Sequence, residues 1–354
     1  MKVTQQNNGG PSGPVRVAVV GAGIRGRMYA AIISQLHNGE LVGICDTNQA
    51  ARETAERELQ RPTFDDTAQM CSKTSPDAVV IATPDFAHVE PAVTAAKAGA
   101  HLLIEKPLAT NTQDGLAICR AVDQAGVRAM VAFENHWNGP LSSMKAAADA
   151  GELGRIVSCN SQLDDRIDVP TEMNSWLGKS SPGWFLMSHT VELAGWIAGQ
   201  KPVIASAFGR KDILKAKGID TYDSIHAVIE FDGGMVASVN SCWVLPRSIP
   251  LIFQFRHEMV GTAGAMRADL TDQMLHKATD RYEHPSTIGV TYTGAPTSPP
   301  AQMLAEFITK LLDGSKMTCS LQEGLLNTAA ISAVHKSIET RKPVAVDAIL
   351  TEGQ

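Results

Sequence analysis

The fold is decided by residues 15–26, VRVAVVGAGIRG. The β-branched first half is typical of a buried parallel strand, and residues 27–36 are compatible with a helix. Between them, Gly21, Gly23 and Gly26 stand in G-x-G-x-x-G spacing. In such a turn the first glycine makes the tight bend, the second lets backbone approach a pyrophosphate, and the third packs the helix against the strand. The helix N-terminus then offers N–H groups to the phosphates. We therefore predict cofactor binding by Gly21, Gly23, Ile24, Arg25 and Gly26.

A second apolar run, residues 41–45, ends at Asp46, which lies 20 residues after Gly26. The acid that binds the ribose in this motif belongs at about this position. A carboxylate there accepts hydrogen bonds from both ribose hydroxyls and repels a 2′-phosphate, and Thr47 and Asn48 supply no cation. Asp46 therefore favours NAD over NADP. A second reading, in which Asp46 caps the next helix, is compatible with ribose binding and stays open.

Composition and charge exclude several classes of protein. The chain has 354 residues, 44% of them hydrophobic and 19% charged, which is ordinary for a globular protein with two domains. A net charge of −6 gives no basic surface for nucleic acid or an acidic membrane. No apolar run approaches the roughly 20 residues that span a bilayer. Residues 1–14 lack the apolar core of a signal peptide, and we predict a disordered tail there.

The spacing of the cysteines indicates whether the thiols are reduced and whether they bind a metal ion. The six cysteines are scattered without a C-x-x-C pair, and no tight motif of His, Cys and carboxylate residues occurs. This pattern argues for reduced thiols and against a disulfide framework or a zinc site. We therefore predict a cytoplasmic protein that binds no metal.

The rest of the first 136 residues alternates strands with helices. Apolar runs predict strands at residues 76–82, 101–104 and 129–133, and helices are predicted at residues 49–59, 89–99 and 114–125. Such alternation is typical of a doubly wound α/β domain, which binds ligands at the carboxyl ends of its strands. The residues that follow those strand ends are Thr83, Pro84, Asp85, His88, Glu105, Lys106 and Asn135.

The second half has consecutive strands and reads as α+β with an antiparallel sheet. The predicted strands are residues 155–163, 225–231, 235–243, 251–255 and 258–260. Helices are predicted at residues 140–151, 303–312 and 322–340, and a long loop at residues 278–300. The predicted domains are a nucleotide-binding domain at residues 15–136, an α+β domain at 137–320, and a C-terminal helix at 321–354 that packs back on the first domain.

The motifs GAGIRG, Asp46, ATPDFAH (residues 82–88) and EKP (residues 105–107), in this order, resemble the glucose–fructose oxidoreductase / inositol dehydrogenase / rhizopine-catabolism (Gfo/Idh/MocA) family. The resemblance covers nearly the whole chain. It implies a Rossmann domain followed by a domain with a large open, mostly antiparallel sheet. That sheet forms one wall of the substrate site and often an interface between copies of the chain. We therefore expect a homo-oligomer, a dimer or a tetramer.

Lys106 is the first candidate for catalysis. Hydride transfer from a C–H group requires removal of a proton from the adjacent hydroxyl. A lysine in a dry cleft beside a cationic nicotinamide has its pKa lowered by desolvation and like charge, so it can act as the acid or base. Glu105 could orient the ammonium. The resemblance implies a cis bond before Pro107.

His189 is the second candidate. The family has D-x-x-x-H-x-x-D on a helix that enters the cleft, so its polar side chains share one helix face. In this chain His189 matches the histidine and Glu192 replaces the second acid, but Phe185 stands at the first acid. This departure puts an acid–lysine relay in doubt and leaves His189 and Lys106 as the acid/base pair.

Other residues are candidates for the cofactor or substrate. His88 either holds the cofactor loop or caps a helix. Asn135 could bond the nicotinamide carboxamide, although relatives often have arginine near this position. Paired acids with an arginine suit vicinal hydroxyls, and tryptophans can stack on a sugar face or fill the core. The predicted substrate-binding residues are Trp137, Asp164, Arg166, Trp176, Trp184 and Glu192.

Three functions follow, in order of preference. The first is an NAD-dependent dehydrogenase that oxidises a secondary hydroxyl of a sugar, sugar derivative or cyclitol. The second is a redox-neutral lyase, glycosidase or epimerase that retains NAD and works through a keto-sugar. The third is a non-catalytic regulator that senses NAD or a ligand.

Overall fold

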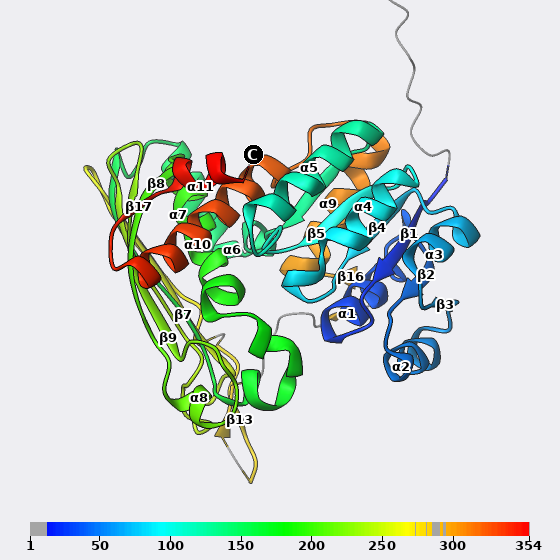
Figure 1. The fold of residues 1–354 in the computed structure, drawn as a ribbon, viewed down its shortest axis with the longest axis horizontal. Helices are drawn as coiled ribbons and strands as arrows, with labels where there is room; N and C mark the ends of the chain where they lie inside the picture. The colour runs from blue at the N-terminus through cyan, green and yellow to red at the C-terminus, as the bar shows by residue number, and fades with distance from the viewer. Residues whose placement is uncertain (1–12, 273, 281, 285–290, 293–294, 354) are drawn as a thin grey trace, which may run out of the picture.

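The computed structural model describes residues 13–272, 274–280, 282–284, 291–292 and 295–353. It has two sheet domains side by side, joined by a long C-terminal helix between them (Figure 1). Most of the predicted tail, residues 1–12, lies outside the described residues, as does part of the predicted loop 278–300.

The first domain is a parallel sheet with helices on both faces, as predicted. Its strands are β1 (Val15–Val20), β2 (Gly39–Cys45), β3 (Thr63–Phe64), β4 (Ala78–Ile81), β5 (His101–Glu105) and β6 (Ala129–Ala132). Its helices are α1 (Ile24–Ile33), α2 (Gln49–Leu59), α3 (Thr67–Thr74), α4 (Val89–Lys97) and α5 (Thr112–Ala125). The strand order β3-β2-β1-β4-β5-β6 reverses direction between β1 and β4, and a doubly wound sheet binds its ligand at such a reversal.

The second domain contains an open, mostly antiparallel sheet, which confirms the predicted fold class. Its strands are β7 (Ile156–Asp165), β8 (Pro202–Arg210), β9 (Ser224–Phe231), β10 (Val236–Cys242), β11 (Phe253–Gly261), β12 (Ala265–Asp269) and β17 (Val344–Ala345). Their order is β12-β11-β7-β10-β9-β8-β17, and only the β7–β10 pair is parallel. Two short hairpins pair β13 (Lys277–Ala278) with β14 (Tyr282–Glu283) and β15 (Thr291–Tyr292) with β16 (Ala295–Pro296).

Helices cover only the face of this sheet that looks toward the first domain (Figure 1). The remaining helices are α6 (Gly139–Asp149), α7 (Ser188–Ala198), α8 (Ile213–Ala216), α9 (Pro299–Asp313), α10 (Leu321–Thr340) and α11 (Val346–Glu352). Short 3₁₀ or π turns are η1 (Asp85–Ala87), η2 (Glu134–Trp137), η3 (Val169–Met173), η4 (Ser175–Lys179) and η5 (Gly183–Met187). No helix among the described residues is long and apolar enough to cross a membrane.

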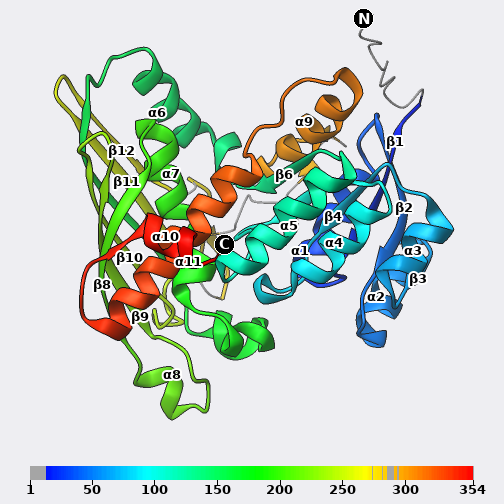
Figure 2. The ribbon, with the colours of Figure 1, turned by 45° about the horizontal axis from the view of Figure 1, so that its top comes forward.

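Two helices that follow the second sheet return to the first domain. Helix α9 lies beside the first domain (Figure 2), and its buried Met303, Leu304 and Phe307 belong to that domain's apolar core. Helix α10 touches both domains, because Thr328 donates a hydrogen bond to the Ala109 carbonyl oxygen while other residues of α10 pack in the second core. The domains are therefore fixed to each other around the carboxyl edge of the first sheet.

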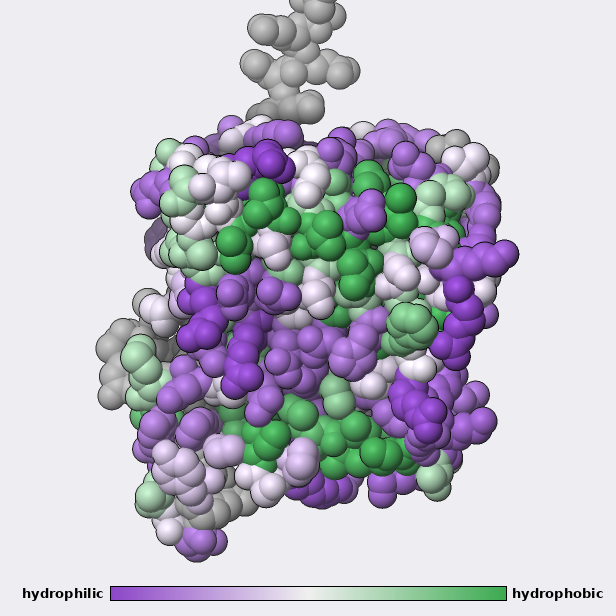
Figure 3. Space-filling view, turned by 90° about the vertical axis from the view of Figure 1, so that its left-hand side faces the viewer, coloured by the Kyte–Doolittle hydropathy of each residue, from purple (hydrophilic) through white to green (hydrophobic). Residues whose placement is uncertain are grey.

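The outer face of the second sheet has no helix over it. Along β9, side chains alternate between buried and exposed, so alternate residues reach solvent. Ile204, Phe208, Val228 and Val236 are large apolar side chains exposed on β8, β9 and β10. Figure 3 shows this face, with apolar areas separated by a polar band.

Candidate active site

The glycine turn between β1 and α1 leaves open space for a pyrophosphate. Gly21 has φ of +99°, and a Cβ added there would lie 2.4 Å from the Ala82 carbonyl oxygen. A Cβ on Gly26 would lie 1.6 Å from the Gly21 oxygen, whereas a Cβ on Gly23 would meet no atom within 4 Å. No side chain caps α1, so its first N–H groups stay available to a phosphate. The turn therefore fits the phosphates of a dinucleotide.

Asp46 is tied to this turn from the end of β2. Its Oδ2 accepts a hydrogen bond of 2.7 Å from the Ala22 N–H, and its Oδ1 accepts one of 2.8 Å from the Asn48 N–H. Asn48 caps α2, because its side chain accepts from the Ala51 N–H, so the alternative that Asp46 is the cap is wrong. The Arg52 guanidinium donates to the Asp46 carbonyl oxygen at 2.7 Å. Asp46 is thus fixed beside the glycine turn, where it can accept hydrogen bonds from ribose hydroxyls.

The loop after β4 is held to the loop after β5 by His88. The His88 ring is buried, with Nδ1 2.9 Å from the Pro107 carbonyl oxygen and Nε2 3.1 Å from the Thr83 carbonyl oxygen. Its side chain makes no capping hydrogen bond to α4. This geometry favours the reading in which His88 holds the cofactor loop.

Asp85 carries a buried carboxylate in the same loop. Its Oδ2 accepts a short hydrogen bond from the Ser180 hydroxyl, and its Oδ1 has no hydrogen-bond partner among the described residues. Burial raises the pKa of Asp85, and the hydrogen bond from Ser180 opposes that shift. Pro84 immediately precedes the η1 turn that contains Asp85.

Arg25 does not lie free at the phosphate turn. Its Nε donates to Glu105 Oε1 at 2.6 Å, and its Nη2 pairs with Glu134. The other oxygen of Glu105 accepts a hydrogen bond of 3.0 Å from the Lys106 backbone N–H. This network links α1 to the ends of β5 and β6 and fixes the backbone that presents Lys106.

Lys106 reaches from the first domain to the second. Its Nζ donates a hydrogen bond of 2.6 Å to the Phe185 carbonyl oxygen and lies 4.6 Å from the centre of that ring. Burial lowers the pKa of Lys106, while the carboxylates of Glu105 and Glu134 act in the opposite direction. The bond between Lys106 and Pro107 is cis, as the resemblance implied.

His189 and Asn135 lie on the same side of the site. The Asn135 amide nitrogen is 3.2 Å from His189 Nδ1, so in this orientation Nδ1 accepts and the proton is assigned to Nε2. Burial lowers the pKa of His189 well below its ordinary value, and the positive charge of Lys106 lowers it further. His189 is therefore neutral at pH 7 and is a hydrogen-bond donor at Nε2.

Most of the predicted substrate-binding residues have side-chain partners within the protein. Glu192 pairs with His136 at 2.7 Å, and the Trp137 indole donates to Glu306 at 2.8 Å. Trp184 stacks on His335 with ring centres 4.9 Å apart. Among these candidates, Trp176 lies at the site, because its ring makes edge contacts with Phe86 and Phe185.

The remaining candidates lie at the end of β7. The Arg166 guanidinium pairs with Asp168 at 2.6 Å. Asp164 follows Gln162 on the outer face of the sheet and accepts a hydrogen bond of 2.5 Å from its amide. The next residue, Asp165, points to the inner face, where the positive charge of Lys106 acts on its carboxylate. Alternation along the strand puts the two acids on opposite faces. Which face lies toward the first domain was not known from the sequence.

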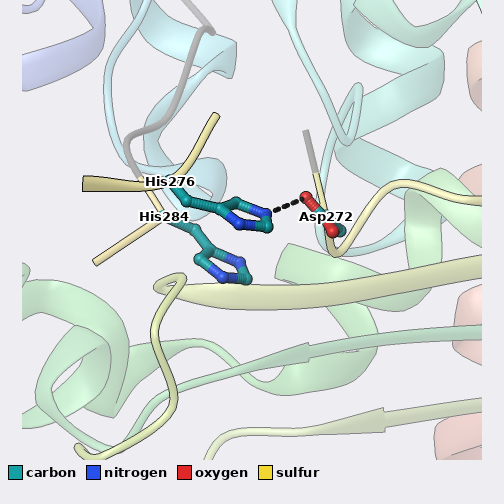
Figure 4. A group of neighbouring side chains, drawn as sticks. All are labelled: Asp272, His276 and His284. Atoms are coloured by element: carbon teal, nitrogen blue, oxygen red, sulfur yellow. Dashed lines mark hydrogen bonds and ion pairs between the residues drawn. The ribbon is translucent and has the colours of Figure 1, made fainter. Parts of the chain in front are cut away.

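Among the described residues, one group of side chains has the composition of a metal site. Asp272, His276 and His284 bring their ligand atoms within 4.8 Å of one another (Figure 4). Both nitrogens of His276 are already engaged, Nε2 with Asp272 at 3.0 Å and Nδ1 with the Tyr282 hydroxyl at 3.0 Å. This hydrogen-bonded cluster accounts for the arrangement without an ion. The sequence prediction of no metal stays a prediction.

Comparisons with known proteins agree with this geometry. A sequence model described as "Oxidoreductase family, NAD-binding Rossmann fold" matches residues 15–133, and one described as "GFO/IDH/MocA C-terminal domain" matches residues 141–267. The fold and the site thus define a two-domain, NAD-dependent oxidoreductase. The chain belongs to the Gfo/Idh/MocA family.

Several members of the family are similar to this chain. It is 28% identical to scyllo-inositol 2-dehydrogenase (NAD(+)) of Bacillus subtilis, over 71% of this chain and 73% of that protein. It is 25% identical to inositol 2-dehydrogenase of Rhizobium meliloti, over 94% of this chain and 99% of that protein. It is also 25% identical to 2,7-anhydro-N-acetylneuraminate hydratase of Escherichia coli, over 73% of this chain and 68% of that protein. The crystal structure of myo-inositol 2-dehydrogenase from Lactobacillus plantarum shares the fold, with a TM-score of 0.82, 19% identity and coverage of 94% and 99%.

Proposed function

We propose that this protein oxidises a secondary hydroxyl of a sugar, sugar derivative or cyclitol by hydride transfer to NAD. The observation that carries the proposal is the meeting of Lys106 with the segment that bears His189. Lys106 lies at the end of a strand that faces the cofactor site, and its ammonium contacts Phe185, one helical turn before His189. An acid/base group and a hydrogen-bond donor therefore adjoin the edge where the nicotinamide ends of such cofactors bind.

A bound NAD would supply the acceptor for the hydride of the carbinol carbon. Lys106 in its neutral form takes the hydroxyl proton, and burial favours that neutral form. His189 donates its Nε2 hydrogen to the same oxygen and so orients the hydroxyl. Asn135 holds the imidazole in the tautomer that this role needs.

The proposed substrate class rests on the relatives and on the walls of the site. The Bacillus subtilis and Rhizobium meliloti proteins are named for inositols. In this chain, Trp176, Phe86 and Phe185 form an aromatic group that can pack against the C–H face of a ring. The Oδ1 of Asp85, which has no partner in the described part of the chain, can accept a hydrogen bond from the cofactor or from a substrate hydroxyl.

The test is an assay for NADH absorbance with purified protein, NAD and a panel of inositols, glycosides, aldoses and sugar acids. Formation of NADH with one class supports the proposal and names the substrate class. Absence of NADH and of substrate consumption with every class, despite binding of NAD, contradicts it and favours the regulator.

A redox-neutral enzyme is the second candidate. Phe185 stands where the family resemblance implies an acid, and one relative is named a hydratase. In such an enzyme the substrate is consumed while the cofactor returns to its oxidised form. The same assay separates the two, because consumption without NADH favours the redox-neutral reaction.

We also propose that the outer face of the second sheet joins copies of this chain into a dimer or tetramer. Phe208 is 64% exposed and Val228 48% exposed on a sheet face that no helix covers. A Phe208→Glu, Val228→Glu variant should elute as a smaller species in size-exclusion chromatography with light scattering, while its circular dichroism stays unchanged. A monomeric wild type would contradict the proposal.

The scattered, mostly buried thiols favour a reducing compartment, the cytoplasm.

A further inference from the structure

We propose that Asp165 is the positioning residue for Lys106, and that its carboxylate does the work that an acid at position 185 would do. The proposal rests on the proposed function, because it concerns the same proton. Lys106 must lose a proton to act as base and must pass on the one that it takes. The nearby strand β7 supplies a carboxylate for both steps.

Strand alternation directs Asp165 into the site. Along β7, Cys159, Ser161 and Leu163 are buried on the inner face of the sheet, and Asp165 continues this series. Asp165 is the last residue of β7 and is 6% exposed. Asp164 belongs to the other series and accepts its hydrogen bond from Gln162.

The surroundings of Asp165 are apolar on one side and charged on the other. The Phe185 ring contacts Lys106, whose Nζ is 4.6 Å from its centre, and Trp243, whose ring is 5.9 Å away. Trp243 in turn neighbours Asp165, because β10 and β7 pair in parallel with Asn240 opposite Gln162. The positive charge of Lys106 and the Trp243 indole both lower the pKa of Asp165, although the indole Nε1 makes no hydrogen bond within the usual distance among the described residues. Lys106 and Asp165 form no direct ion pair within 4.0 Å among the described residues. In the proposal, a water or a substrate hydroxyl links the two groups.

Burial without a close cation sets the protonation of Asp165. Desolvation raises its pKa to about 7, although the Lys106 charge opposes the shift. A carboxyl group with a pKa of about 7 can take up and release a proton at neutral pH. The other charged groups around the pair are Glu105, Glu134, Arg25 and Asp85 beside Lys106, His189 opposite it, and Asp164 and Asp168 beside Asp165.

The proton balance of the step is simple. The hydride leaves the carbinol carbon with its electron pair for NAD, and the O–H bond breaks as an N–H bond forms on Lys106. The ammonium then gives a proton to the Asp165 carboxylate through the linking water, and Asp165 releases it to solvent. Neither Lys106 nor Asp165 changes its oxidation state, and the pair returns to its starting protonation.

The test measures Lys106 itself, without substrate or cofactor. Trace acetylation with acetic anhydride, quantified by mass spectrometry over a range of pH, reports the titration of the Lys106 amine. In Asp165→Asn the midpoint for Lys106 should move to lower pH by about one unit or more, because the ammonium loses a negative neighbour. Asp165→Glu, which keeps the charge, should stay near wild type. Asp164→Asn is the matched control, since it removes a neighbouring carboxylate that faces away, and it should leave the midpoint unchanged.

If the Asp165→Asn variant does not fold, a second measurement tests the proposal without it. In Lys106→Met, the infrared C=O stretch of protonated Asp165 should persist to higher pH than in wild type, because the carboxylate loses its positive neighbour. An unchanged Lys106 midpoint in folded Asp165→Asn, an equal shift in Asp164→Asn, or an unmoved infrared titration in Lys106→Met would each overturn the proposal.

Activity gives a separate readout once a substrate is known. Asp165→Asn should lower kcat by about ten- to a hundred-fold and move the pH profile, with little change in NAD affinity. If no polyol yields NADH, the proposed function fails, but the acetylation experiment still decides whether Asp165 controls Lys106. The two failures are therefore distinguishable.

Discussion

The ammonium of Lys106 donates a hydrogen bond of 2.6 Å to the backbone carbonyl oxygen of Phe185. This bond joins the carboxyl end of β5 to the η5 turn that leads into the helix of His189. The proposed acid/base group of one domain, Lys106, thus touches the segment that carries its proposed partner, His189, in the other.

Lys106→Ala should therefore lower turnover by about 10²- to 10⁴-fold, because proton transfer at the reacting oxygen is lost. NAD affinity, measured by fluorescence titration, should change little, since the phosphate and ribose contacts remain. Lys201→Ala, which removes an exposed lysine far along the chain, is the control. Wild-type turnover in Lys106→Ala would show that the proton follows another route.

Asp46→Ala should weaken NAD binding by about ten-fold and narrow the preference for NAD over NADP. The substitution removes the carboxylate that we expect to bind the ribose and repel a 2′-phosphate, together with its hydrogen bond from the Ala22 N–H. Calorimetric titration with both cofactors measures this. Asn48→Ala removes only the cap of α2 and should cost about 1 kcal/mol of stability with the preference unchanged. An unaltered preference in Asp46→Ala would assign the discrimination to other residues.

Replacing Gly23 and Gly26 of the turn by alanine should have different effects on stability and on NAD affinity. Gly23→Ala adds a methyl group where no protein atom lies within 4 Å, so the melting temperature should hold while NAD affinity falls, because the methyl group occupies space for the pyrophosphate. Gly26→Ala places its Cβ 1.6 Å from the Gly21 oxygen, and the chain must shift, at a cost of roughly 3 kcal/mol. Thermal unfolding and NAD titration of both variants separate the effects. Equal loss of stability in both would contradict the assigned geometry.

The buried His257 should make the protein less stable in mild acid. Its side chain is fully buried on β11, and burial lowers its pKa to about 4. Between pH 6.5 and 4 the unfolded chain binds a proton that the folded chain does not, so this contribution is complete above that range and falls as pH falls. From pH 7 to pH 5 it amounts to about 2 kcal/mol. Urea unfolding at the two pH values should show a smaller difference in His257→Gln than in wild type or in the exposed control His37→Gln.

Much of the fold could be predicted from the sequence, because periodicity and turn residues are local. Helix α2 has the predicted bounds, 49–59, and the predicted doubly wound domain is confirmed. Strand β11 was predicted as two pieces, because the polar His257 interrupts its apolar run although it is fully buried. The short α3 and the long β8 were not predicted, and the parallel β7–β10 pair depends on contacts distant in sequence.

The site could be predicted only in part. Strand ends are readable, so the residues after β2, β4 and β5 could be assigned to one edge of the sheet. The alternation of Cys159, Ser161 and Leu163 with Asn160 and Gln162 places Asp164 and Asp165 on opposite faces of β7. Which of the two faces lies toward the first domain depends on how the domains pack, and no local pattern reveals that. The partners of Trp184 and Glu192 are His335 on α10 and His136 on η2, and their positions depend on how the domains pack.

The measurement that tests the central claim most directly is the ratio of NADH formed to ketone formed, on purified protein with NAD and the inositol and glycoside panel. Net oxidation predicts one NADH for each ketone, and the loss of both products in Lys106→Ala. Conversion of a substrate with no accumulation of NADH, or with full activity in Lys106→Ala, would contradict the account.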